Sequence, residues 1–276
     1  MIVSSQNALL VILGSALAGC GGGGGGAAGS GGSQPAPQQP PGLFDATATE
    51  EAGLSGHSLT TNNNMLASFT GALSRQDHSL TLDGATGPIN TARTSATLAN
   101  GDQVTIKDSG AAHVARFTQE AQSGQTRFGV IGIPTNANDL PSGEMTYVGS
   151  AEIQAVDLIA VYELTGSAEI VANFGNNSVG ITISDLAGSR TTGADTSVVQ
   201  NGGGITISGA DISGLSYSGG SASLTGGAFG STLSGSELVT TSGGFYGPGA
   251  TETGAALSID DTHSGNVLIN GTVIGQ

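Results

Sequence analysis

The chain has 276 residues and a formal net charge of −15, with only 6 Lys and Arg residues against 48 glycines. This charge excludes nucleic-acid binding as a function, because contacts with phosphates need clusters of Lys and Arg. The single Cys excludes both a disulfide framework and a cysteine-rich zinc site. The composition is typical of a surface or extracellular β-protein and does not identify a ligand.

The N-terminus predicts a lipoprotein signal peptide. Residues 9–13 are apolar, but the stretch is too short to span a bilayer and suits the apolar part of a secretory signal. The sequence Leu17-Ala18-Gly19-Cys20 resembles the lipobox of bacterial lipoproteins, in which the Cys becomes the first residue of the mature chain and carries acyl chains. We therefore expect residues 1–19 to be the signal peptide and Cys20 to be the lipid attachment site, with palmitate as an acyl group.

Residues 20–42 predict a tether behind this anchor. A glycine run occupies residues 21–26, and residues 34–41 are rich in proline and glutamine. Gly/Ser tracts behave as flexible coils, and Pro-rich tracts behave as stiffer spacers. A phosphate-binding loop is excluded, because a dinucleotide fingerprint needs a strand before it and a helix after it.

From residue 43 onward, apolar and polar residues alternate, which predicts half-buried β-strands. Between residues 146 and 156 the alternation places Tyr147, Gly149, Ala151, Ile153 and Ala155 on one face. The same period predicts strands around the pairs Ala168/Ile170, Ile181/Ile183, Ile205/Ile207, Leu257/Ile259 and Val267/Ile269. Turns are expected at 175–177, 201–204, 219–220, 226–227 and 264–266, where Gly and Asn tolerate positive φ.

The folded part divides into two predicted domains, at 43–140 and 141–276. The first is a smaller β-rich domain with strand candidates at 79–82, 102–107, 113–119 and 126–133, and residues 134–141 form a connector. It holds five of the six basic residues, namely Arg75, Arg93, Lys107, Arg116 and Arg127. An acidic partner is therefore expected to contact this domain through Arg75 and Arg93. The second domain is an antiparallel sandwich or barrel, and a barrel leaves no exposed edge.

A β-solenoid is the alternative fold. Residues 180–185 (Gly-Ile-Thr-Ile-Ser-Asp) and 204–209 (Gly-Ile-Thr-Ile-Ser-Gly) have the form of two rungs spaced 24 residues apart. The pattern does not continue on either side, although a solenoid needs at least three repeats.

Three segments resemble the transferrin-binding protein B-like (Slam-dependent) surface lipoproteins. Residues 243–254 (Gly-Gly-Phe-Tyr-Gly-Pro-Gly-Ala-Thr-Glu-Thr-Gly) are similar to the C-terminal signature of that family, and we call them the GFYG signature. Residues 141–151 resemble the entry into its barrel, and residues 164–175 resemble its second strand and first hairpin. The signature residues are Gly244, Phe245, Tyr246, Gly247, Pro248, Glu252 and Gly254. The one departure is Ala255-Ala256, where a second Gly is usual.

The resemblance implies an all-β chain with a C-terminal eight-stranded antiparallel barrel preceded by a smaller β-rich domain. It also implies a lipid anchor in the outer membrane, exposure at the cell surface through a Slam-type translocon, and capture of a protein or haem ligand for iron acquisition. Adhesion or a cell-envelope interaction without a nutrient role is the alternative. Receptors for transferrin usually have two lobes, and this chain has one, which makes transferrin itself a less favoured ligand.

The signature is expected to stabilise the fold: Phe245 and Tyr246 add aromatic bulk to the core, and Glu252 satisfies backbone donors at the turn. No catalytic, cofactor or metal site is expected. We expect the acidic pair Glu50/Glu51 to be solvated and the pair Asp260/Asp261 to flank a turn. We expect the segment Ser234-Gly235-Ser236 to be a turn and not to contain a nucleophile. The loop at 260–266 lacks the ligand spacing of a calcium loop. Residues of a type that could bind haem are Tyr162, Tyr217, His113 and His263, whereas Tyr147 and Tyr246 are expected to be barrel residues.

Overall fold

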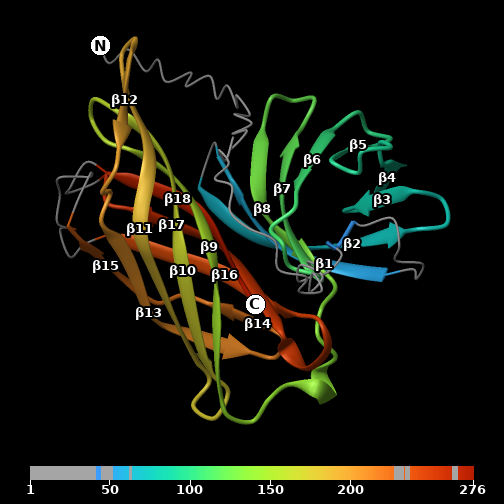
Figure 1. The fold of residues 1–276 in the computed structure, drawn as a ribbon. Helices are drawn as coiled ribbons and strands as arrows, with labels where there is room; N and C mark the ends of the chain where they lie inside the picture. The colour runs from blue at the N-terminus through green and yellow to red at the C-terminus, as the bar shows by residue number, and fades with distance from the viewer. Residues whose placement is uncertain (1–41, 45–51, 62–63, 227–232, 234–236, 263–266) are drawn as a thin grey trace, which may run out of the picture. The chain divides into compact units, whose positions relative to one another are not determined.

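The computed structural model describes residues 42–44, 52–61, 64–226, 233, 237–262 and 267–276. The expected signal peptide, Cys20 and all of the expected tether except Gly42 lie outside these residues. The described part is built almost entirely of β-strands, with two short 3-10 helices, η1 (Ala137–Asp139) and η2 (Pro248–Ala250) (Figure 1). None of its helices has the length and apolar character needed to cross a membrane.

The first half of the chain forms an eight-stranded antiparallel sheet in the order β4-β3-β2-β1-β8-β7-β6-β5. Its strands are β1 (Ala52–Thr60), β2 (Met65–Ser74), β3 (Ser79–Leu82), β4 (Ala85–Pro88), β5 (Ser95–Thr97), β6 (Gln103–Lys107), β7 (Val114–Glu120) and β8 (Thr126–Gly132). The two edges of the sheet meet through a bridge between Ile89 and Ala96 and a hydrogen bond from Ala99 N to Thr86 O (2.9 Å). The sheet therefore curls on itself and encloses a small core.

The second half forms the predicted eight-stranded antiparallel barrel. Its strands are β9 (Glu144–Val156), β10 (Val161–Asn173), β11 (Ser178–Thr192), β12 (Asp195–Val199), β13 (Gly204–Ser213), β14 (Ser216–Ser218), β15 (Ser221–Thr225), β16 (Leu238–Tyr246), β17 (Glu252–Asp260) and β18 (Leu268–Gly275). The circle closes because β18 pairs with β9 and β13 pairs with β11. Both β14 and β15 pair with β13, so they act as one strand, and β12 is an extra strand on the outer part of β11.

The alternation predicted for the first barrel strand is confirmed. Along β9, the side chains of Tyr147, Ala151, Ile153 and Ala155 are buried in the barrel core. They meet inward-facing residues of the other barrel strands, such as Ile181 and Ile207. Burial of each large aliphatic side chain contributes roughly 1.5–3 kcal/mol, so this strip is a main source of barrel stability.

The two candidate solenoid rungs are neighbours within the barrel. Ile181 on β11 pairs with Ile207 on β13, and Ile183 pairs with Ile205, in antiparallel register. The rungs of a β-helix stack in parallel, so the solenoid alternative is wrong. The similarity of the two segments reflects two adjacent barrel strands that each bury a pair of isoleucines.

One expected turn has a different role. Gly219 and Gly220 have φ values of 84° and 103° and separate β14 from β15, but the chain continues in the same direction past them. The reversal before them occurs at Gly214, which has a φ of 62° and links β13 to β14. The glycine pair therefore marks an irregularity inside a strand, which is a common use of Gly in sheets.

Candidate functional site

Exposed apolar side chains gather at one end of the barrel, where β9, β11 and β17 finish and β10, β16 and β18 begin; we call it the loop end. Strand pairing aligns one row of residues across seven strands at this end: Leu238, Asp260, Leu268, Val156, Val161, Thr191 and Thr196. The next row inward includes the buried residues Ile259, Ile269 and Tyr162. Because side chains alternate between faces, the outermost row points away from the core.

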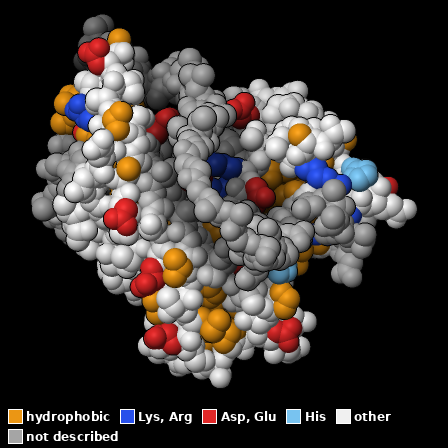
Figure 2. All heavy atoms as spheres, in the orientation of Figure 1, with side chains coloured by type: hydrophobic (Ala, Val, Ile, Leu, Met, Phe, Trp, Pro, Cys, Tyr) orange, Lys and Arg blue, Asp and Glu red, His pale blue; other side chains and the backbone are white. Residues whose placement is uncertain are grey.

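Two strongly exposed apolar residues of the loop end lie in the turn between β9 and β10. Leu158 is 77% exposed, Ile159 is 67% exposed, and Leu238 on β16 is 66% exposed. Figure 2 shows hydrophobic side chains at the surface of the barrel beside β12, where Val198 is also exposed. Large exposed apolar groups that lie together are typical of interaction surfaces.

The turn that carries Leu158 and Ile159 is held in place by Asp157. Its Oδ1 accepts hydrogen bonds from Ile159 N (2.8 Å) and Ala160 N (2.7 Å), and its backbone N donates to Ala160 O (3.0 Å). The other carboxylate oxygen accepts from the hydroxyl of Tyr162 at 2.9 Å. The backbone of the turn is therefore fixed while both apolar side chains point outward, and a preordered contact loses less entropy on binding.

A short polar chain supports this turn. Arg190 Nε on β11 donates to the Tyr162 hydroxyl at 3.0 Å, and the guanidinium carbon lies 5.7 Å from the centre of the tyrosine ring. Burial acts to raise the pKa of Asp157, but hydrogen bonds from Ile159, Tyr162 and Ala160, together with the charge of Arg190, lower it overall. The ionised form of Asp157 is the one that holds the turn.

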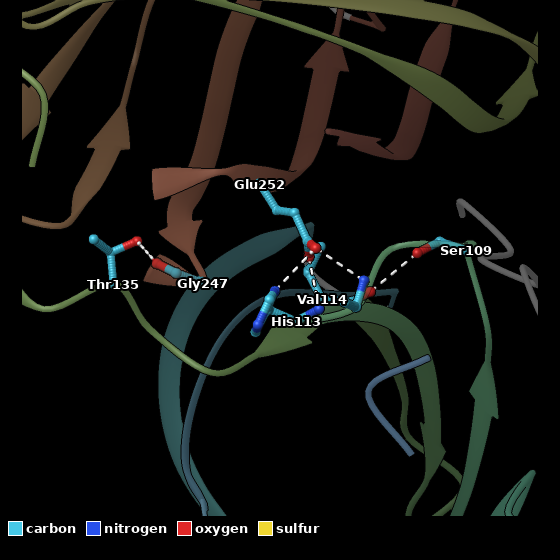
Figure 3. A network of polar contacts seen from close by, with 7 residues as sticks. Ser109, His113, Val114, Thr135, Gly247 and Glu252 are labelled. Carbon is cyan, nitrogen blue, oxygen red and sulfur yellow. Dashed lines mark hydrogen bonds and ion pairs between the residues drawn. The ribbon is translucent and has the colours of Figure 1, made fainter. Parts of the chain in front are cut away.

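The GFYG signature lies at the contact between the barrel and the N-terminal sheet. Glu252, which is 5% exposed, accepts hydrogen bonds from Ala112 N at 2.8 Å and His113 N at 2.7 Å (Figure 3). His113 Nδ1 lies 3.0 Å from the same carboxylate, and Thr135 Oγ1 donates to Gly247 O at 2.9 Å. Glu252 does satisfy backbone donors, but these belong to the segment before β7 of the N-terminal sheet and not to its own turn.

The two aromatic residues of the signature are buried in two different hydrophobic clusters. Phe245 packs inside the barrel, with ring centres 4.8 Å from Phe174 and 5.4 Å from Tyr217. Tyr246 is fully buried in a separate cluster with Val114 and Val130 of the N-terminal sheet. Tyr246 lies on the barrel strand β16, as expected, but neighbouring strand residues face opposite sides, so its ring points out of the barrel core and into the contact with the N-terminal sheet.

The glycines of the signature allow the two parts to approach closely. A Cβ on Gly244 would lie 2.9 Å from His57 Nε2, and one on Gly254 would lie 3.3 Å from Val114 and Val130. Gly247 has a φ of 73°, which favours glycine before the turn that begins at Pro248. Nearby, His57 Nδ1 lies 2.7 Å from Ser242 Oγ, and burial lowers the pKa of His57 to about 4.

The described residues of a type that could bind haem are engaged in contacts within the fold. Tyr162 and Tyr217 are 2% and 1% exposed, and the Tyr217 hydroxyl lies 3.1 Å from Thr253 Oγ1. Tyr147 is a barrel core residue whose hydroxyl donates to Ala250 O at 2.8 Å, and burial raises its pKa to about 12. Within the described part of the chain, no group of three or more His, Cys, Asp and Glu residues could hold a metal ion. His263, Glu50, Glu51 and the segment 234–236 lie outside the described residues.

The basic residues of the N-terminal sheet all have contacts within the chain. Arg116 donates to Thr272 Oγ1 at 3.0 Å and Ser150 O at 2.7 Å on the barrel, and burial lowers its pKa although Glu152 acts in the opposite direction. Lys107 pairs with Glu152 at 2.6 Å. The remaining contacts are those of Arg127 with Asp83, Arg75 with Leu43 O and Arg93 with Phe44 O. This sheet is thus tied to the barrel and to the start of the folded chain by its own cations.

The sequence pattern did not single out Leu158 and Ile159. The local signal was present, because an Asp followed by two apolar residues interrupts the alternation between two strands. What the pattern could not show is that these side chains leave the core at the same end of the barrel as Leu238, which is far away in sequence and is brought to this end by the pairing of β16, β17, β18 and β9.

The fold is similar to that of solved transferrin-binding protein B chains. Transferrin-binding protein B from Haemophilus parasuis, crystallised as a single-residue mutant, is 18% identical, with a TM-score of 0.54 over 81% of this chain and 44% of that one. Transferrin-binding protein B from serogroup B Neisseria meningitidis is 19% identical, with a TM-score of 0.50 over 81% and 43%. The haemoglobin receptor HpuA from Kingella denitrificans gives a TM-score of 0.39 at 12% identity, over 83% of this chain and 87% of the receptor.

The chain has a transferrin-binding protein B-like fold. It spans less than half the length of the two transferrin-binding protein B chains that it matches. No protein-family model matches the sequence. A search of curated proteins gives no match either.

Proposed function

We propose that the chain is a lipid-anchored surface lipoprotein of the outer membrane that binds a host or environmental protein, such as an iron or haem carrier, for nutrient capture. Cys20 would carry the anchor, residues 20–42 would form the tether, and a Slam-type translocon would bring the chain to the surface. The smaller domain 43–140 and the barrel domain 141–276 would act as one unit. Binding and not catalysis would be its role.

The observation that carries this proposal is the loop end of the barrel. Leu158 and Ile159 are exposed on a turn that Asp157 fixes and that joins the strand ends at Val156 and Val161, at the same end of the barrel as Leu238. Exposed apolar side chains that lie together are typical of interaction surfaces, and an ordered backbone lowers the entropy lost on binding.

The charges around the loop end define the partner further. Glu163 on β10 and Asp195 on β12 are exposed near the apolar residues, and Arg190 is engaged with Tyr162. Glu163 shares an outward row with Ser189 and Val198. A partner surface that is apolar at its centre and basic at its edge would complement this end, because opposite charges speed association and exclude wrong partners.

The test is a binding assay with purified chain against iron-loaded transferrin and haemoglobin, the proteins named for the structural neighbours. We expect the chain to bind one of these two carrier proteins. The double variant Leu158→Asp/Ile159→Asp should weaken that binding by at least about tenfold, because it places charges where apolar contact is needed. Both side chains are exposed, so the fold should be unaffected.

Val148→Asp is the matched control. Val148 is 62% exposed on the same strand, β9, but at the opposite end of the barrel. Equal loss of binding in this control would contradict the assignment of the loop end. Surface exposure of the chain with no affinity for either carrier would favour adhesion or another cell-envelope interaction, and vesicle binding through Leu158 and Ile159 would replace the protein partner with a lipid surface.

A further inference from the structure

The contact between the N-terminal sheet and the barrel encloses a histidine. His57 on β1 is buried, and its Nδ1 lies 2.7 Å from the hydroxyl oxygen of Ser242 on β16. Its Nε2 faces Gly244 and Tyr246, because a Cβ on Gly244 would lie 2.9 Å from Nε2 and 3.3 Å from the Tyr246 hydroxyl. Burial raises the pKa of Tyr246, so that hydroxyl stays neutral. We call the contact formed by these four residues the joint; β16 meets the imidazole ring there with neutral groups.

His57 stands in a row of the N-terminal sheet that already carries two cations. Strand pairing aligns His57 with Val130 on β8, Val130 with Arg116 on β7, and Arg116 with Lys107 on β6. Residues aligned in this way share one face of a sheet. A protonated His57 would therefore add a third positive charge to that face, two strand spacings or roughly 10 Å from Arg116.

The carboxylates at the contact between the two sheets have partners of their own. Glu152 on β9 pairs with Lys107 at 2.6 Å and lies 3.7 Å from Arg116 Nε. Glu252 on β17 accepts two backbone N–H groups from the segment before β7 and lies 3.0 Å from His113 Nδ1. Both acids thus compensate donors other than the ring of His57.

Burial of His57 favours its neutral form. Taking a charge out of water is costly, and burial lowers the pKa of His57 to about 4 from an ordinary value of 6.5. A ring that returns to water when the joint opens regains its ordinary pKa, so opening takes up a proton between these two pH values. The closed joint is therefore most stable above about pH 6.5 and loses stability as the pH falls toward 4.

We propose that His57 makes the joint between the N-terminal sheet and the barrel sensitive to protons. The joint is closed while the ring is neutral, and it opens when the ring takes up a proton. This device acts between two parts of the chain and does not depend on the partner proposed for the loop end.

The test is the labelling rate of a thiol buried beside the joint. Ser258 on β17 is buried and pairs with Asn270, whose side chain contacts Asn64 of the N-terminal sheet. Ser258→Cys in a chain that carries Cys20→Ala gives one thiol at this place, since Cys20 is the only cysteine. Its rate is divided by that of the same thiol in the urea-unfolded chain at the same pH. We expect this ratio to rise at least about tenfold from pH 7.5 to pH 5.0, where most exposed carboxylates are still ionised.

A second thiol separates opening of the joint from unfolding of the whole chain. Thr241 on β16 is buried and pairs with the core residue Leu257, so Thr241→Cys places the thiol inside the barrel. Its labelling ratio should rise less than about threefold over the same pH range, because local opening leaves the barrel core closed. Equal rises for the two thiols would overturn the proposal.

Histidine variants identify the group that takes up the proton. His57→Gln should abolish the pH response of the Ser258→Cys thiol, whereas His113→Gln and His78→Asn should keep it; Asn suits the φ of 50° at His78. If His57→Gln does not fold, NMR titration of the His57 ring in the wild type decides, with an expected midpoint of about 4 in the closed chain. The proposal is overturned if labelling does not rise, if the rise persists in His57→Gln or is lost in His113→Gln, or if the ring of His57 titrates near pH 6.5 while the joint stays closed.

Discussion

Glu252 shows how much of this molecule depends on a single side chain. Its carboxylate is buried and accepts the backbone N–H groups of Ala112 and His113, which no strand partner satisfies in its place. The residue therefore joins β17 of the barrel to the segment before β7. It is the one charged member of the GFYG signature, and its position explains why an acid is needed at that place.

We predict that Glu252→Gln lowers the free energy of unfolding by roughly 1.5–3 kcal/mol, the usual contribution of hydrogen bonds to a charged group. The amide keeps one acceptor oxygen, so only one of the two N–H groups retains a good partner. Chemical denaturation of both proteins measures the difference. Glu163→Gln, at an exposed position on β10, is the control and should change stability by less than about 0.5 kcal/mol. A Glu252→Gln protein as stable as wild type would show that the contact is dispensable.

Some strands could be predicted from the alternation of apolar and polar residues, and others could not. The strands Ser79–Leu82 and Thr146–Val156 were predictable because one face is apolar and the other polar, and the structure places β3 and β9 there. The strands β1 and β2 were not predicted, since Gly53, Gly56 and Gly71 interrupt their apolar pattern. Gly56 is required there because a Cβ would collide with the ring of Phe69.

The candidate site was harder to predict than the strands. The resemblance of residues 243–254 indicated the barrel but not that Glu252, Gly244 and Gly254 lie at the contact with the other sheet. Nor did the pattern indicate that Arg75 and Arg93 bind carbonyl groups of Leu43 and Phe44. Such contacts join residues far apart in sequence, and they depend on strand order and register that local periodicity does not encode.

We predict that the β9–β10 turn depends on Asp157 for its ordered backbone. Asp157→Ala removes the acceptor for Ile159 N and Ala160 N, so these two amides should exchange with solvent hydrogen at least tenfold faster than in wild type. Amide hydrogen exchange measured by NMR provides the readout. Asp195→Ala, at an exposed position on β12, should leave both rates unchanged. Unaltered exchange in Asp157→Ala would mean that the turn is held by other contacts.

At the scale of the whole molecule, two curled sheets are linked through buried polar contacts that involve Glu252, Arg116 and His57. The proposed role depends on where this molecule is displayed. A receptor for a large external protein must reach the outside of the cell, and the lipobox-like segment ending at Cys20 is the feature that would anchor it there.

The most direct test is therefore protease accessibility on intact cells, comparing wild type with Cys20→Ala and using a periplasmic protein as the control for membrane integrity. We predict that protease removes the wild-type chain from intact cells, while the Cys20→Ala chain is released into the medium or retained inside. Protection of the wild-type chain in intact cells, with digestion only after the outer membrane is opened, would contradict the account, because a chain facing the periplasm could not capture a large external protein.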